Sequence, residues 1–223
     1  MAYLDLLSTN HKSTQRDYLG RVNDQEFPKH IAAQLAKQWG YDYWDGDRRI
    51  NYGGYHYREG YWDSVASRLA DHYSLKSGDK VLDIGCGKGF LLYDMLKLVP
   101  GLQVFGLDIS EYAIQNAKDE IKPNLLRGNA TELPFQENEF ELVFSINTFH
   151  NLKNFELDRA LREMLRVSKR SKYICVESYR NELEKANLLY WQVTCEMFCA
   201  PDEWDWWFNN CGYDGDHSFI FFE

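Results

Sequence analysis

The stretch Val81-Leu82-Asp83-Ile84-Gly85-Cys86-Gly87-Lys88-Gly89 decides the fold class of this chain. A short apolar run leads directly into three glycines, and a helical pattern follows from about residue 88. Glycines at such a turn let the backbone bend sharply and approach a ligand closely beside a helix N-terminus. The stretch therefore predicts a buried strand that ends in a ligand-binding loop.

A second acidic position follows at the end of the next predicted strand, in Gly106-Leu107-Asp108. An acid there accepts hydrogen bonds from ribose hydroxyls, and the alternative role is to cap the helix that follows. A Walker-A loop requires Ser or Thr after Gly-Lys, but Gly89 stands there; a dinucleotide loop requires Gly where Phe90 stands. The acid Asp83 suits a ligand that carries an ammonium group and no pyrophosphate.

Short apolar runs alternate with amphipathic stretches from residue 80 onward. The predicted strands are Lys80–Ile84, Gln103–Asp108, Asn124–Arg127, Glu141–Ile146, Lys172–Ser178 and Ser218–Phe222. The predicted helices start near residues 28 and 61 and cover about 88–98, 110–119, 155–167, 181–199 and 201–211. This alternation predicts an α/β fold, with a doubly wound, mostly parallel sheet covered by helices on both faces.

Two regions follow from this pattern. Residues 1–77 are predicted to form an N-terminal helical and aromatic-rich lid extension, whose first 27 residues are a polar, irregular arm. Residues 78–223 are predicted to form one compact ligand-binding domain, without an internal repeat or a low-complexity linker.

Over roughly residues 78–178 these motifs resemble the class I S-adenosylmethionine-dependent methyltransferases. The resemblance implies a Rossmann-like sheet, S-adenosylmethionine as methyl donor and S-adenosylhomocysteine as product. The cofactor-binding residues that it implies are Asp83, Gly85, Cys86, Gly87, Asp108, Ile109, Asn129, Ala130 and Asn147. The family usually has Gly-Asp-Ala where this chain has Gly128-Asn129-Ala130, so Asn129 is either an adenine contact or a turn-forming residue.

The family usually closes its sheet with two antiparallel strands. From Cys211 to Glu223 there is room for one full strand only. A shortened C-terminal strand region is therefore expected.

Residues 39–62 hold nine Trp or Tyr among 24 positions, with Asp, Arg, Asn and His between them. That mixture suits stacking on a polar ring or caging a cation; the alternative is that these rings pack the extension onto the domain. Predicted acceptor contacts are Arg48, Tyr52, Tyr55 and Tyr57, with Tyr179, Trp191, Glu177 and Tyr190 as second-choice contacts. His150 and His56 are candidate general bases, although His150 is equally a candidate substrate contact or packed loop residue.

Composition excludes some classes of binding partner. The formal charge of 25 − 34 = −9 disfavours a nucleic-acid partner, and no apolar run is long enough for a bilayer span. The N-terminus has no leader pattern, so a cytoplasmic location is expected, with the five cysteines as free thiols and no metal site. The oligomeric state is open, with a homodimer as one option.

These observations favour an enzyme that methylates an O or N atom of a small polar molecule, with a sugar or nucleotide-sugar as the leading acceptor. The alternatives are methylation of a protein or nucleic acid, and a non-catalytic S-adenosylmethionine-binding scaffold protein. All seven Trp residues lie outside residues 80–180, so acceptor specificity is expected in the flanking segments.

Overall fold

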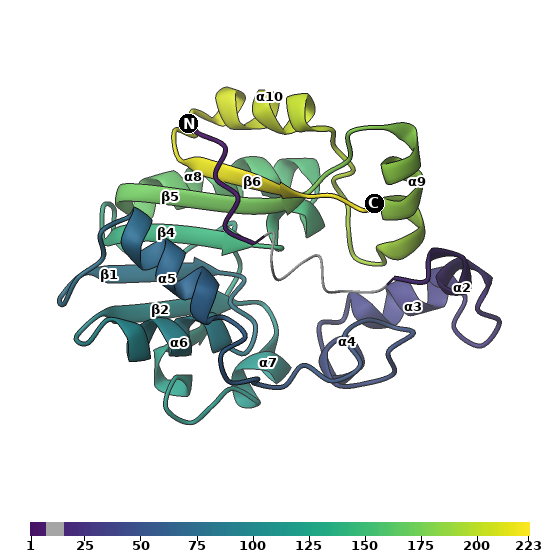
Figure 1. Cartoon of the computed structure of the whole chain (residues 1–223), viewed down its shortest axis with the longest axis horizontal. Coiled ribbons are helices and arrows are strands. Elements are labelled where there is room, and N and C mark those ends of the chain that lie inside the picture. The colour runs from purple at the N-terminus through teal and green to yellow at the C-terminus, as the bar shows by residue number, and fades with distance from the viewer. Residues whose placement is uncertain (8–15) are drawn as a thin grey trace.

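The computed structural model describes residues 1–7 and 16–223, and its centre is a six-stranded sheet in the order β3-β2-β1-β4-β5-β6 (Figure 1). The strands are β1 (Lys80–Ile84), β2 (Gln103–Asp108), β3 (Leu125–Arg127), β4 (Phe140–Ile146), β5 (Ser168–Glu177) and β6 (Asp216–Ile220). Every neighbouring pair of strands is parallel. The predicted Rossmann-like α/β fold is confirmed.

Helices cover both faces of the sheet. They are α2 (Tyr18–Asn23), α3 (Lys29–Ala36), α4 (Tyr41–Trp44), α5 (Asp63–His72), α6 (Phe90–Leu98), α7 (Glu111–Gln115), α8 (Asn154–Val167), α9 (Glu182–Trp191) and α10 (Pro201–Cys211), with 3-10 turns η1 (Lys122–Asn124) and η2 (Phe149–Asn151). The core of one face contains α5 and α6, and the core of the other contains α8 and α10. In Figure 1, α2, α3 and α4 lie together beyond the carboxyl ends of the strands.

Alternate residues of each central strand supply the two cores. In β4, Leu142 and Phe144 pack with α5 and α6, whereas Val143 between them packs with α8 and α10. This period of two is the expected geometry of a strand buried on both faces. It explains why the central strands appear in the sequence as continuous apolar runs.

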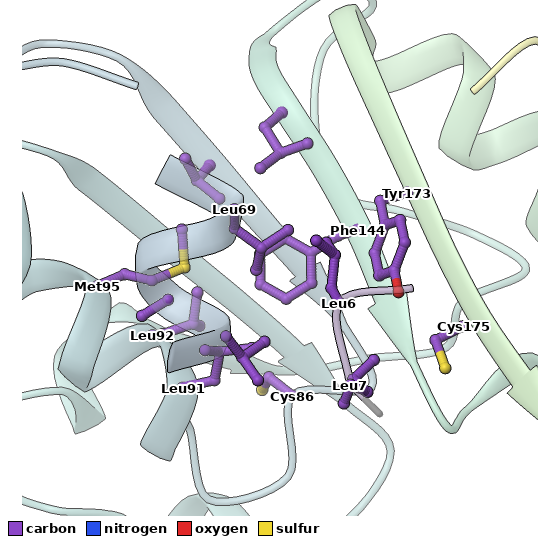
Figure 2. Packing of buried hydrophobic residues seen from close by; sticks show 14 of the residues in the cluster. Leu6, Leu7, Leu69, Cys86, Leu91, Leu92, Met95, Phe144, Tyr173 and Cys175 are labelled. Atoms are coloured by element: carbon purple, nitrogen blue, oxygen red, sulfur yellow. The ribbon is translucent and has the colours of Figure 1, made fainter. Parts of the chain in front are cut away.

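Two apolar side chains within the predicted polar arm, Leu6 and Leu7, belong to the main core, whereas Met1, Ala2, Tyr3 and Asp5 are exposed. Leu6 and Leu7 are each 3% exposed, and Figure 2 shows them packed among the side chains of α5, α6 and the sheet. Two leucines in a row can be buried here because the segment lies against the sheet. Part of the predicted arm, residues 8–15, lies outside the described residues.

The C-terminal edge is shortened, as predicted, and the N-terminal segment lies against it. Tyr3 forms a parallel bridge with His217 of β6, and the Leu4 N–H donates to the His217 carbonyl at 2.7 Å. The backbone of the first residues thus satisfies polar groups of β6 that an edge strand would otherwise leave unpaired.

The helix predicted over residues 181–199 ends at Trp191, eight residues early. The chain turns extended at Gln192, and the N–H groups of Glu196 and Met197 donate to the His150 carbonyl instead of continuing the helix. Cys195 and Cys199 therefore do not share a helix face. No helix in the described part of the chain is both long and apolar enough to cross a membrane.

Replacing Leu6 with Ala should lower the free energy of unfolding by about 3 kcal/mol, because it opens a cavity in the main core. Urea denaturation measures this change. The matched control is Leu183→Ala, since Leu183 is 70% exposed on α9 and should change stability by less than about 0.5 kcal/mol. Equal effects of the two substitutions would show that the first residues are not core.

Candidate functional site

A cavity of about 860 Å³ lies at the carboxyl ends of the central strands. Its floor is the loop after β1, the end of β2, the loop after β4 and the end of β5, and residues 39–62, here called the aromatic segment, cover it. Open α/β sheets bind ligands at this edge, and the volume lies at the upper end of the ~300–1,000 Å³ typical of small-molecule sites. The cavity is therefore the candidate active site.

The structure brings most of the predicted site residues to this cavity. Its lining includes all nine predicted cofactor residues: Asp83, Gly85, Cys86, Gly87, Asp108, Ile109, Asn129, Ala130 and Asn147. It also includes both histidines and four of the predicted acceptor contacts: His56, His150, Arg48, Tyr52, Tyr55 and Trp191. His150 is 2% exposed, while His56 is exposed.

Two predicted acceptor contacts, Tyr57 and Tyr179, do not line the cavity. The Tyr57 hydroxyl donates to Asp94 of α6 at 2.6 Å, which holds its ring against the outer part of that helix. Tyr179 lies beyond the end of β5, where the Lys185 ammonium group is 4.9 Å from the centre of its ring. The structure therefore does not bring these two side chains together with the others in the cavity.

The loop after β1 has the geometry that its glycines predict. Gly85 and Gly87 have φ of 84° and 56°, a region that disfavours side chains, and a Cβ on Gly87 would lie 2.8 Å from the Trp44 ring. The Asp108 carboxylate accepts from the Gly87 N–H at 2.7 Å and from the Ser110 N–H at 2.8 Å. Asp108 thus ties the glycine loop to the start of α7 while lining the cavity.

Four buried side-chain oxygens along the cavity have no hydrogen-bond partner among the described residues. They are Asp83 Oδ1, Asn147 Oδ1, Asn151 Oδ1 and Glu177 Oε2. Glu177 Oε2 lies 3.4 Å from His150 Nε2, but the other three have no ion-pair partner in the described part of the chain either. Leaving a buried acceptor unpaired costs about 1–3 kcal/mol, so these three oxygens in one cavity indicate a ligand rich in hydrogen-bond donors. Burial, with a smaller contribution from nearby Asp108, raises the pKa of Asp83 well above its usual value. A cationic group bound there would stabilise its carboxylate.

Asn129 takes part in a turn. Its Oδ1 accepts from the Thr131 N–H at 3.0 Å, the local bond expected of a turn-forming Asn. The side chain is exposed and lines the cavity, so the turn does not remove its amide group from reach of a ligand.

His150 and Glu177 form a buried pair where the end of β5 borders the cavity. His150 Nε2 lies 3.4 Å from Glu177 Oε2, and the Glu177 N–H donates to His150 Nδ1 at 3.3 Å. Burial raises the pKa of Glu177 to about 8, although the Gln192 amide donates to its Oε1. A carboxyl group with such a pKa can accept a proton near neutral pH. From the sequence, Glu177 is only a second-choice acceptor contact. Its position at the carboxyl end of a predicted strand is the signal that could have identified it as a candidate base.

Lys88 joins the glycine loop to the aromatic segment, a role that sequence reasoning missed. Its Nζ lies 2.7 and 2.9 Å from the two carboxylate oxygens of Asp45 and donates to the Tyr55 carbonyl at 2.8 Å. The Tyr112 hydroxyl also donates to Asp45, at 2.8 Å. The sequence identifies Lys88 only as part of a failed phosphate-loop pattern, because its partner lies 43 positions earlier.

The rings of the aromatic segment pack on one another as well as on the cavity. Trp44 stacks on Tyr52 with 5.4 Å between ring centroids and 6° between planes, and its Nε1 donates to Ser110 Oγ at 2.9 Å. Tyr55 stacks on Phe90 of α6. Some of these rings therefore fasten the segment to the domain, and several of them also line the cavity.

Comparison with known proteins agrees with this geometry. The family described as "Methyltransferase domain" matches residues 75–212. Demethylmenaquinone methyltransferase of Symbiobacterium thermophilum is 28% identical over 60% of this chain and 57% of its own length. The mouse mitochondrial arginine-hydroxylase NDUFAF5 is 36% identical over 48% of this chain and 31% of its own length, so the chain spans less than two thirds of either relative.

Among solved structures, the methyltransferase in the complex with the Trm112 activator of Haloferax volcanii is similar in fold. It superposes with a TM-score of 0.54 at 22% identity and covers 70% of this chain and 76% of its own. A likeness at this identity concerns the fold alone. The family match over residues 75–212, together with the sheet order and the glycine loop after β1, identifies the family: the chain belongs to the class I S-adenosylmethionine-dependent methyltransferases.

Proposed function

We propose that this protein transfers the methyl group of S-adenosylmethionine to an oxygen or nitrogen atom of a small polar molecule. The observation that carries the proposal is the set of three buried acceptors without a hydrogen bond beside the glycine loop, Asp83 Oδ1, Asn147 Oδ1 and Asn151 Oδ1. A donor with an ammonium group and ribose hydroxyls supplies the hydrogen-bond donors that these oxygens lack.

The residues present fit this methyl donor. Asp83 and Asn147 would hold its ammonium group, Asp108 would accept from the ribose hydroxyls, and Ile109 would lie against the adenine ring. When bound, the donor supplies a methyl group on a positively charged sulfur, which departs as a neutral thioether. The chain's own part is to align the acceptor and to keep water out, and good alignment lowers a barrier by on the order of 7–11 kcal/mol.

The cover over the cavity supports a small acceptor. The aromatic segment lies over the glycine loop, held there by the buried Lys88–Asp45 ion pair, so a macromolecule would have to displace it. Tyr52 and Tyr55 present rings to the cavity, and Asn51 and Arg48 present polar groups. Rings and hydrogen-bonding groups in alternation favour a polar cyclic acceptor such as a sugar or nucleotide-sugar.

An acceptor hydroxyl must lose its proton as it attacks the methyl carbon. Glu177 Oε2 is the candidate to receive this proton, because it accepts no hydrogen bond, Glu177 lines the cavity and burial raises the pKa of its carboxyl to about 8. His150, 3.4 Å away, would hold the carboxyl in place and stabilise its charge. His56, at the exposed side of the cavity, is the second candidate base.

Replacing Asp83 with Asn should weaken binding of S-adenosylmethionine by about tenfold to hundredfold, the value of a hydrogen bond between charged groups. Isothermal titration calorimetry measures the affinity. The control is Asp119→Asn, because the Asp119 side chain is 97% exposed and does not line the cavity. An unchanged affinity of the Asp83 variant, or no binding by the unaltered protein, would contradict the proposal.

With the acceptor that gives the fastest release of S-adenosylhomocysteine in a screen of small hydroxyl and amine compounds, kcat should rise with pH through about 8. The rise follows because Glu177 accepts a proton only as the carboxylate, which forms above its pKa. Glu177→Gln should lower kcat by about 100-fold and remove this inflection, while leaving donor binding intact.

The matched control for the base is Glu196→Gln. Glu196 lies in the segment after α9 and pairs with Lys37 on the surface. It should retain both the rate and the pH profile. A Glu177 variant that keeps the rate and the inflection of the unaltered protein would remove Glu177 from the mechanism.

A further inference from the structure

Three arginine side chains surround Trp191 at one end of the cavity. The guanidinium carbons of Arg16, Arg21 and Arg48 lie 5.9, 5.3 and 5.3 Å from the centre of the Trp191 ring. These three residues are here called the arginine cluster. Arg16, Arg48 and Trp191 line the cavity, and Arg21 lies behind them on α2.

Two members of the cluster have no carboxylate partner in the described part of the chain. Arg21 donates to the carbonyls of Arg49 and Ile50, both at 2.7 Å, and Arg48 donates to the Asn51 carbonyl. Carbonyl oxygens orient a guanidinium group but do not neutralise it. The next residue shows the contrast, because Arg49 forms ion pairs with Glu26 and Asp47, each at 2.7 Å.

The cluster concentrates positive charge where burial already disfavours it. Burial and the nearby charge of Arg48 lower the pKa of Arg21 to about 10, with Asp24 acting in the opposite direction. Burial lowers the pKa of Arg48, with Arg16 adding to this effect and Tyr52 opposing it. The chain as a whole has a formal charge of −9, whereas three arginines gather at this end of the cavity. A local field of this kind attracts anions and repels cations.

The cluster is adjacent to the candidate base. Trp191 is followed by Gln192, whose amide donates to Glu177 Oε1, and the charge of Arg16 is close enough to lower the pKa of Glu177 against the effect of burial. A molecule whose anionic end lies against the cluster would therefore place its neighbouring atoms toward Glu177 and the methyl donor.

We propose that the arginine cluster binds an anionic oxygen group, a carboxylate or a phosphate, of the methyl acceptor. The assignment rests on the proposed function, since it takes this cavity as the acceptor site. Guanidinium groups match both oxyanions because each can donate two parallel hydrogen bonds, and an ammonium group cannot. The cluster then orients the acceptor, and the Trp191 ring supplies a surface on which the guanidinium groups stack.

Calorimetry on the full chain saturated with S-adenosylhomocysteine tests the proposal with two pairs of probes. Benzoate against benzamide tests a carboxylate, and phenyl phosphate against phenol tests a phosphate. At least one anion should bind at a single site about tenfold more tightly than its neutral counterpart, and added salt should weaken it. The stronger of the two anions identifies the group.

Arg48→Met should lower the affinity for that anion by about tenfold while leaving the affinity for S-adenosylhomocysteine unchanged, which also confirms that the variant is folded. Arg49→Met is the matched control, because its side chain pairs with Glu26 and Asp47 outside the cavity lining. It should bind the anion as the unaltered protein does.

Three results would overturn the proposal: no saturable binding of either anion in the millimolar range, equal binding of the neutral probes, or full affinity in the Arg48 variant. If S-adenosylhomocysteine binds in such an experiment, the proposed function stands and only the acceptor class is wrong. If S-adenosylhomocysteine does not bind, the proposed function is wrong, and the assignment of the arginine cluster to the acceptor is wrong with it.

Discussion

The buried ion pair between Lys88 and Asp45 is the interaction on which the site depends. Lys88 belongs to the glycine loop and is 3% exposed, and Asp45 belongs to the aromatic segment. Removing either partner would leave the other charge buried without compensation, which typically costs several kcal/mol. The pair joins the loop after β1 directly to the segment that covers it, and the Trp44–Ser110 hydrogen bond and the Tyr55–Phe90 stack support the same cover.

The covered cavity has two ends of different chemical character. Near β1 and β4 its unpaired groups are oxygens of Asp83, Asn147 and Asn151, which suit a cation or hydrogen-bond donors. Near α9 its charged groups are arginines, which suit an anion. A cationic methyl donor and an anionic acceptor would each be attracted to its own end, with Glu177 nearby to take the proton. Such separation positions two reactants without requiring the chain to contact the reacting atoms closely.

The sequence predicts the parts of this structure that depend on local patterns. β1 and β2 match their predicted bounds, and the glycine loop and Asp108 lie where the motif implies, because strand, turn and acid are neighbours in the chain. The features it misses depend on distant partners. Lys88 meets an acid 43 positions earlier, and the helix after β5 ends at Trp191 because later amides bond to His150. Tyr55 and Tyr57 stand two positions apart in the same aromatic stretch of sequence. Packing alone decides that Tyr57 bonds to Asp94 of α6 while Tyr55 lines the cavity.

A crystal structure of the protein with S-adenosylhomocysteine tests the central claim most directly, that this one cavity holds donor and acceptor at opposite ends. The account predicts the product amino group within hydrogen-bond distance of the Asp83 carboxylate, its ribose hydroxyls at Asp108, and its sulfur facing Glu177 and the end of the cavity near Trp191. A product bound outside the aromatic segment, or with its sulfur turned away from Glu177, would contradict the account.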